Sequence, residues 1–157
     1  MKEYNYNPKR YFLSVTAPGF FMIGILIFSL SKNIKSTNFN IYTLAIIVSI
    51  YGIINTFVSI SHPEKIVDDG EKLEFHSFGR VHSYYLNKVK YFRIKEYYNG
   101  KIYLRIGNPT LLKGRYWINA PMYTDGEELY LSFREREKKI HPDSLKYRES
   151  ISPKKKK

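Results

Sequence analysis

Hydrophobic and polar positions divide the chain into two parts, and the first part predicts a pair of membrane-spanning helices. Residues 11–31 and 36–61 contain no Lys, Arg, Asp or Glu, and most of their positions are apolar. About 20 apolar residues in an α-helix cross a hydrocarbon core roughly 30 Å thick, so both runs are long enough. We therefore predict transmembrane helices at about residues 11–31 and 40–61, within a membrane segment of residues 11–62. Pro18-Gly19 predicts a kink or a later start in the first helix.

The link between the two runs is too short to hold a domain, so we expect an antiparallel hairpin with both chain termini on one side. Basic residues near the helix ends indicate which side this is, because cytoplasmic segments are enriched in Lys and Arg. Five basic residues flank the outer ends and two lie in the link: Lys2, Lys9, Arg10, Lys65 and Lys72 against Lys32 and Lys35. This bias predicts a multi-pass protein of the cell membrane, with both termini, including residues 1–10, in the cytoplasm. A cleaved signal peptide is the alternative for the first run. However, that run is longer than such a peptide requires, and no small-residue cleavage site precedes Lys32.

Beyond His62-Pro63 the pattern changes to alternating apolar and polar residues, which predicts β-strands. The alternation covers five short stretches: residues 72–77, 81–85, 90–98, 101–106 and 115–119. Asn99-Gly100 predicts a two-residue type I′ turn, because both of its central positions need a positive φ. The polar part of the chain is therefore expected to begin with an antiparallel sheet.

A C-terminal amphipathic helix is predicted at residues 125–140. Leu129, Phe133 and Ile140 form one apolar stripe at helical spacing. Asp125 as N-cap, with Glu128 three residues later, matches a capping box. Pro142 ends the helix, and we expect the basic tail of residues 141–157 to be disordered.

Several local patterns in this part are typical of one domain family. They are Lys65-Ile66-Val67-Asp68-Asp69-Gly70 before Leu73-Glu74-Phe75, the turn Phe78-Gly79-Arg80, Leu86-Asn87-Lys88-Val89 and the final helix. This stretch resembles a bacterial pleckstrin-homology-like (PH-like) domain of the kind that follows two transmembrane helices. The resemblance implies a membrane α-hairpin plus a mainly-β domain of residues 64–140. In that domain a curved antiparallel sheet, or partly open barrel, is capped by the C-terminal amphipathic helix. With the strand that precedes the turn at Gly70, six strands are clear, and the seventh strand of the full fold is expected in residues 107–123.

Composition and motifs argue against catalysis. The chain has no cysteine, which rules out disulfides, thiol chemistry and a cysteine zinc site. It also contains neither a nucleotide-binding glycine motif nor a nucleophile elbow. His76 and His82 would face each other across a turn centred on Gly79, but no third ligand is evident, so we interpret them as surface histidines. We expect no enzyme activity, no metal and no cofactor.

Charge indicates where the domain makes its contacts. The chain carries 26 Lys and Arg against 14 Asp and Glu. The densest group is Lys88, Lys90, Arg93 and Lys95, interleaved with tyrosines, and the second is the tail Lys154, Lys155, Lys156 and Lys157. Near a membrane such residues attract anionic lipid head groups; the alternative is that they guard sheet edges and keep the domain soluble. Basic residues beside aromatics also suit nucleic acid, but membrane attachment argues against that partner.

We interpret the chain as a small integral membrane protein that presents a cytoplasmic PH-like domain. The domain would act as a protein-binding or scaffolding module, with another membrane protein as one kind of partner and with electrostatic contact to anionic lipid in the bilayer. Strand edges and the groove beside the final helix are the expected docking sites. The alternative is a protective, immunity-type membrane protein that acts through its transmembrane hairpin.

Overall fold

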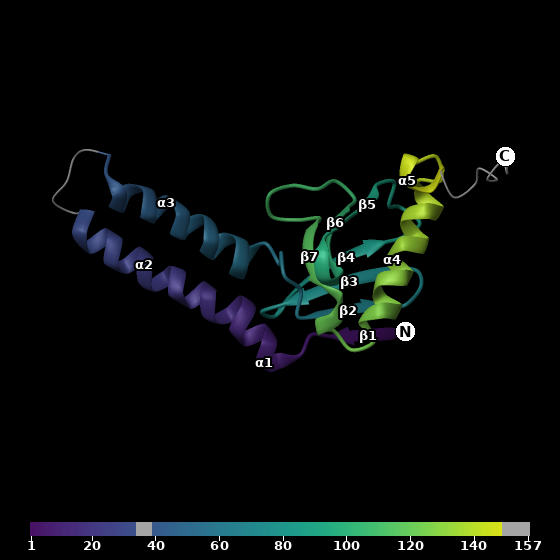
Figure 1. The fold of residues 1–157 in the computed structure, drawn as a ribbon, viewed down its shortest axis with the longest axis horizontal. Coiled ribbons are helices and arrows are strands. Elements are labelled where there is room, and N and C mark those ends of the chain that lie inside the picture. The colour runs from purple at the N-terminus through teal and green to yellow at the C-terminus, as the bar shows by residue number, and fades with distance from the viewer. Residues whose placement is uncertain (34–38, 149–157) are drawn as a thin grey trace, which may run out of the picture.

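The computed structural model describes residues 1–33 and 39–148, and it contains a helical hairpin attached to a β-rich domain (Figure 1). The first helix runs without a break through α1 (Pro8–Tyr11), the π-helical turn η1 (Phe12–Thr16) and α2 (Ala17–Asn33). The second consists of α3 (Ile41–Ile53) and the π-helical turn η2 (Ile54–Val58). Both helices are long and apolar enough to cross a membrane by length and composition.

The first helix starts earlier than expected. Asn7 caps it by accepting a hydrogen bond from the backbone N–H of Arg10, and Pro8 occupies the first turn, where its missing N–H does no harm. Pro18 lies inside the helix and cannot donate to the carbonyl four residues earlier. The turn η1 directly before α2 accommodates that missing bond by widening the helix.

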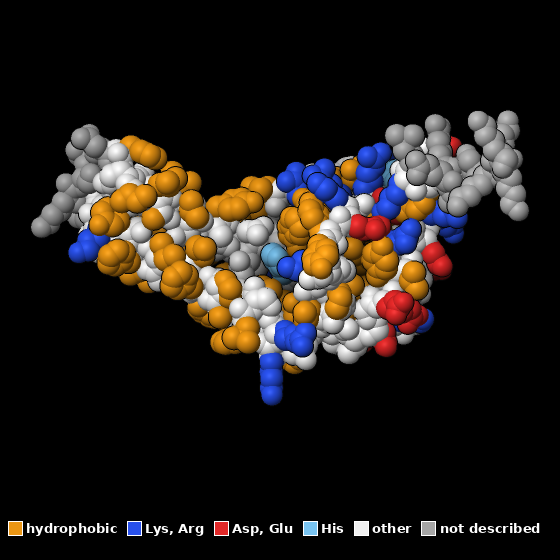
Figure 2. All heavy atoms as spheres, viewed as in Figure 1, with side chains coloured by type: hydrophobic (Ala, Val, Ile, Leu, Met, Phe, Trp, Pro, Cys, Tyr) orange, Lys and Arg blue, Asp and Glu red, His pale blue; other side chains and the backbone are white. Residues whose placement is uncertain are grey.

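The two helices pack closely where small residues lie between them. A Cβ atom on Gly19 would come within 2.7 Å of the Phe57 ring, and one on Gly52 within 3.2 Å of Met22. On their other faces the helices leave large apolar side chains exposed, including Phe21 and Ile27. Figure 2 shows hydrophobic side chains distributed along the whole length of the hairpin on the face in view. Such an exposed surface is typical of a lipid-facing hairpin and not of core helices in a soluble protein.

Seven strands within the described residues form two antiparallel sheets. The four-stranded sheet has the order β1 (Lys2–Asn5), β2 (Lys65–Asp68), β3 (Lys72–Ser77), β4 (Arg80–Tyr85). The three-stranded sheet has the order β5 (Phe92–Glu96), β6 (Lys101–Ile106), β7 (Arg115–Asn119). Short 3₁₀ turns, η3 (Tyr98–Gly100) and η4 (Ala120–Met122), follow β5 and β7. The helix α4 (Gly126–Ile140) packs against both sheets, and α5 (Leu145–Arg148) follows it.

The strand that the sequence pattern did not predict is β1, in the N-terminal segment; the described residues 107–123 add no strand beyond β7, which lies at the predicted stretch 115–119. It pairs with β2 so that Lys2 lies opposite Asp68 and Tyr4 opposite Ile66. Tyr4 is buried, at 2% exposure, in the same core as the other strands. The hairpin is therefore inserted between two paired strands. Residues 1–10 are not a separate segment, because their first half completes the four-stranded sheet.

The helix α4 supplies the apolar stripe that the sequence predicted. Leu129 and Phe133 are fully buried in the core, and Ile140 packs against its edge. The predicted capping box is wrong. Asp125 has a φ of 49° and its side chain makes no cap hydrogen bond, while Glu128 pairs with Lys2 of β1.

The turn at Asn99-Gly100 has positive φ at both residues, as predicted, with values of 58° and 68°. Its loop is one residue longer than expected, because Glu96 pairs with Ile102 and the loop is centred on Asn99. The C-terminal segment also differs from expectation where the structure describes it. Tyr147 of α5 is buried against α4, since its hydroxyl donates to Glu137 Oε2 at 2.6 Å.

Candidate membrane junction and basic sheet face

The first helix is joined to the domain at Tyr11. Its hydroxyl donates to the carbonyl of His62 at 3.0 Å and lies 2.7 Å from the Ser77 hydroxyl at the end of β3. The Tyr11 ring also contacts Phe78, with 6.0 Å between the ring centroids. Phe78 in turn packs on Phe57 of the second helix at 5.0 Å. The β3–β4 turn therefore rests against both helices where they leave the domain.

The second helix is joined to the domain by two backbone carbonyls. Arg80 Nη1 donates to the carbonyl of Val58 at 3.1 Å, and the backbone N–H of Trp117 donates to that of Ser61 at 2.7 Å. Ser61 also donates its hydroxyl to Asn55 Oδ1 at 2.8 Å. These bonds hold the β3–β4 turn and the edge strand β7 at the hairpin end of the domain.

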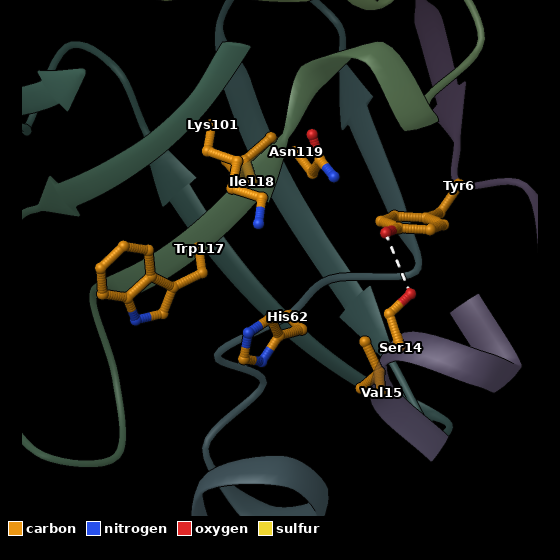
Figure 3. A pocket seen from close by; sticks show the side chains of 8 residues that line it. All are labelled: Tyr6, Ser14, Val15, His62, Lys101, Trp117, Ile118 and Asn119. Atoms are coloured by element: carbon orange, nitrogen blue, oxygen red, sulfur yellow. Dashed lines mark hydrogen bonds between the residues drawn. The ribbon is translucent and has the colours of Figure 1, made fainter. Parts of the chain in front are cut away.

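A pocket of about 330 Å³ lies at this junction, between β7 and the start of the first helix (Figure 3). It is lined by Tyr6, Ser14, Val15, His62, Lys101, Trp117, Ile118 and Asn119. The His62 ring lies between the side chains from β7 and those from the helix. Burial lowers the pKa of His62, and its Nδ1 has no hydrogen-bond partner in the structure. The side chain is therefore neutral near pH 7.

The outward face of the three-stranded sheet is basic, and its residues form rows across the strands. Arg93, Arg105 and Arg115 lie directly opposite one another in neighbouring strands. The next row contains Lys95, Tyr103 and Trp117. At the outward strand positions of this sheet the structure places no Asp or Glu. We call these six residues the basic sheet face.

Aromatic rings hold the cations of the basic sheet face in place. Lys95 Nζ lies 5.2 Å from the centroid of the Tyr97 ring, and the Arg105 guanidinium lies 5.2 Å from that of Tyr103. Tyr103 packs against Trp117 with 4.5 Å between the ring centroids and the ring planes tilted by 34°. Like charges directly across antiparallel strands are destabilising. The row of three arginines therefore carries a mutual repulsion that no Asp or Glu at the outward strand positions of this sheet offsets.

Only some of the basic residues that the sequence analysis grouped together lie side by side in the structure. Arg93 and Lys95 belong to the basic sheet face. Lys88 lies in the turn after β4, over the Tyr85 ring at 5.6 Å, and Lys90 is exposed in the link to β5. Lys154, Lys155, Lys156 and Lys157 lie outside the described residues.

Arg105, Arg115 and Trp117 were missed as site residues. Alternation within β6 and β7 already shows that they point outward. Their meeting with Arg93 and Lys95 depends on the register of three strands, which a single strand's pattern does not contain.

Three of the four edge strands already bond to other segments of the chain. Fewer edges are therefore left for a partner to dock by strand addition. On β5 the backbone N–H of Ile94 donates to Glu137 Oε1 at 2.9 Å, and that of Phe92 to His141 Nε2 at 3.3 Å. On β1 the backbone of Asn5 bonds with Thr124, and on β7 Trp117 bonds with Ser61. Among the described residues, no segment pairs with the outer edge of β4.

The two histidines of the first domain hairpin do not face each other. His76 lies opposite Val81 and His82 opposite Phe75, because the turn is centred between Phe78 and Gly79. His82 lies on the inner face of the sheet, with Nδ1 3.0 Å from the Tyr116 hydroxyl, so it is not a surface histidine. Burial lowers the pKa of His82 most, and the nearby positive charges of Lys113 and Arg80 lower it further. Across the described ranges, no group of three or more His, Asp or Glu side chains could hold a metal ion.

Comparisons with known proteins identify no relative of this chain. No family model matches it, and neither does any curated protein or any solved structure.

Proposed function

We propose that this chain is a small integral membrane protein whose hairpin anchors a PH-like domain at the cytoplasmic face of the cell membrane. The domain is a binding or scaffolding module without catalytic activity. Two features support the anchor: the exposed apolar surface of the helices and their insertion between the paired strands β1 and β2. Sheets of four and three antiparallel strands with a C-terminal helix support the PH-like assignment. The Lys and Arg bias supports the cytoplasmic orientation.

The basic sheet face carries the functional part of the proposal. A row of arginines beside lysine and tryptophan suits carboxylate-rich protein surfaces, because guanidinium groups bind carboxylates in bidentate geometry. Trp and Arg are also the residues that contribute most to binding at protein interfaces. The partner that fits this face is an acidic surface of another protein, such as a membrane protein in the same bilayer.

The second part of the proposal is contact with anionic lipid, which we assign to the residues nearest the hairpin. The strand β7 is bonded to the segment leaving the second helix, whereas β5 is two strands away. Strands are spaced by roughly 4.8 Å, so Arg93 and Lys95 lie about 10 Å across the sheet from the β7 residues of their rows, Arg115 and Trp117. This is about one Debye length at 0.1 M salt. Arg80 and Arg115 are therefore the residues for lipid head groups, and β5 is left for the protein partner.

Affinity purification of the full chain in mild detergent, followed by mass spectrometry, tests the proposal. Arg105→Glu reverses one charge in the middle of the arginine row, and Lys138→Glu makes the same change on an exposed position of α4. We expect a stoichiometric partner that is lost with Arg105→Glu and kept with Lys138→Glu. Absence of any such partner from the unaltered chain would overturn the proposal. If a chain without residues 64–157 keeps its function, the result would favour the alternative, a protective membrane protein that acts through its transmembrane hairpin.

A further inference from the structure

The loop between β6 and β7 presents two adjacent leucines to solvent. Leu111 is 60% exposed and Leu112 is 45% exposed. A single exposed leucine on a soluble surface is ordinary, but two at the tip of a loop are an apolar projection. Neither contributes to the core of the domain.

The loop has a defined shape that keeps these leucines at its tip. The backbone N–H of Thr110 donates to the carbonyl of Lys113 at 2.8 Å, which makes Leu111 and Leu112 the central residues of a tight turn. The Thr110 hydroxyl accepts from the Lys113 N–H at 3.2 Å. At the base, the N–H of Ile106 donates to the carbonyl of Gly114 at 3.0 Å. The leucines are therefore held away from the domain by a closed loop.

The loop projects from the domain toward the side on which the hairpin extends (Figure 1). It leads directly into β7, which is bonded to Ser61 in the segment that leaves the second helix. The other turn at this end, between β3 and β4, carries Phe78, which packs on Phe57 and is also partly exposed. Hydrophobic side chains are thus placed on the helices, on the β3–β4 turn and on the β6–β7 loop at one end of the domain.

The residues after the leucines are basic. Lys113 follows Leu112, and Arg115 begins β7. Lys113 Nζ lies 5.5 Å from the Tyr84 ring centroid, on the domain side of the turn. Apolar residues at a tip with Lys and Arg behind them match a bilayer interface, where anionic head groups overlie the acyl chains.

We propose that Leu111 and Leu112 insert into the cytoplasmic leaflet of the same bilayer that the hairpin spans. The inference rests on the proposed membrane anchor and adds a contact remote from the helices in sequence. With the two helix exits, the leucine loop makes a third support that sets the tilt of the domain. The basic sheet face is then held at a fixed angle beside the membrane, where a partner protein can reach it.

Because the chain has no cysteine, single labels can be placed without altering other residues. Three full-length variants are compared: Leu112→Cys in the loop, Leu131→Cys on the exposed surface of α4, and Ile47→Cys in the second helix. Each carries an environment-sensitive fluorophore and is reconstituted into vesicles of neutral and anionic phospholipid. Quenching is measured with lipids that carry a nitroxide on the acyl chain.

We expect several-fold stronger quenching and a blue-shifted emission at position 112 relative to position 131, with strong quenching at position 47. Quenching at 47 combined with equal, weak quenching at 112 and 131 would overturn the leucine insertion and leave the membrane anchor standing. Weak quenching at all three positions would overturn both. A blue shift at 112 without quenching by the lipid nitroxide would show that a second copy or another protein covers the loop, and it would also refute insertion.

Discussion

The backbone N–H of Trp117 donates to the carbonyl oxygen of Ser61 at 2.7 Å, so the edge of the three-stranded sheet is bonded to the segment that leaves the second helix. Tyr11 makes the corresponding link from the first helix to Ser77 at the end of β3. The hairpin and the domain therefore share one hydrogen-bonded junction. The domain is held at a defined angle to the hairpin and is not tethered by a free linker.

The Tyr11 hydroxyl is the first point at which this junction can be tested. Tyr11→Phe leaves the ring in place but removes the bonds to Ser77 and to the His62 carbonyl. We expect a loss of about 1–2 kcal/mol in the free energy of unfolding, because a buried acceptor is left without its donor. Thermal unfolding in detergent measures it, with Tyr51→Phe at an exposed position as the control. Equal stability of the two variants would contradict the linking role of Tyr11.

Tyr4 tests whether the N-terminal strand belongs to the domain. Tyr4→Ala removes a side chain that is 2% exposed, and we expect a loss of about 3–5 kcal/mol, as for other large aromatics in cores. Tyr98→Ala is the matched control, because Tyr98 is 87% exposed and its truncation is expected to change stability by less than about 0.5 kcal/mol. Hydrogen exchange at the backbone of β2 should accelerate only in Tyr4→Ala. Unchanged protection there would mean that β1 does not hold the sheet.

Gly126→Ala is expected to change the stability of the protein in the direction opposite to that of an ordinary Gly→Ala substitution in a helix. In a helix, Gly→Ala ordinarily stabilises by up to about 1 kcal/mol. A Cβ atom on Gly126 would lie 1.8 Å from the carbonyl oxygen of Ala120, so Gly126→Ala should destabilise the domain, with a lower melting temperature. Gly24→Ala in α2 is the control, because no atom beyond the neighbouring backbone of its own helix lies within 4 Å of the added Cβ. A rise in melting temperature for Gly126→Ala would refute the close contact between α4 and η4.

The same contact explains why local patterns predicted some elements and not others. The strands after residue 64 and the stripe of α4 follow from alternation and helical spacing, which are local. The cap of α4 does not, because it depends on how the start of the helix meets Ala120: there Asp125 has a positive φ and its side chain makes no cap hydrogen bond. The strand β1 has one buried residue, Tyr4, between charged and polar neighbours, so its four residues carry no alternation to detect.

In the candidate site too, features within one segment were predictable from the sequence, whereas features that depend on several aligned strands were not. Arg93 and Lys95 were evident from charge density in one segment. The row that they form with Arg105 and Trp117 exists only once three strands are aligned. His82 was misjudged for a related reason. A turn centred one half-residue earlier puts it opposite Phe75 and turns it toward the core.

Stability should fall as the pH drops from about 7.5 to 5. Burial lowers the pKa of both His62 and His82 in the folded protein, whereas unfolded histidine titrates near 6.5. Near and below that value the unfolded chain binds more protons than the folded one, so the free energy of unfolding decreases as the pH falls. Chemical denaturation at several pH values measures the slope.

The variant carrying both His62→Gln and His82→Gln should show a flatter slope between pH 7.5 and 5. This window lies above the titration of Glu74, whose pKa is lowered by its hydrogen bond to Lys72. A slope as steep as that of the unaltered chain would show that other groups cause the pH dependence.

Glu137 connects α4, the edge of β5 and α5, and it gives the last test. The carboxylate is 4% exposed and accepts from the backbone N–H of Ile94 at 2.9 Å, from the Tyr147 hydroxyl at 2.6 Å and from Lys146 Nζ at 3.0 Å. Burial alone would lower the pKa of Lys146, but its bonds to Glu96 and Glu137 raise it, so the amine remains charged. Glu137→Gln turns an amide NH₂ toward these donors and should cost about 1–3 kcal/mol. Protease cleavage in residues 141–148 should become faster as α5 separates from α4, while Glu135→Gln at an exposed position changes neither quantity. Unaltered cleavage in Glu137→Gln would show that α5 is held by its other contacts, such as the ion pair of Lys146 with Glu96, and that the charge of Glu137 serves the edge of β5.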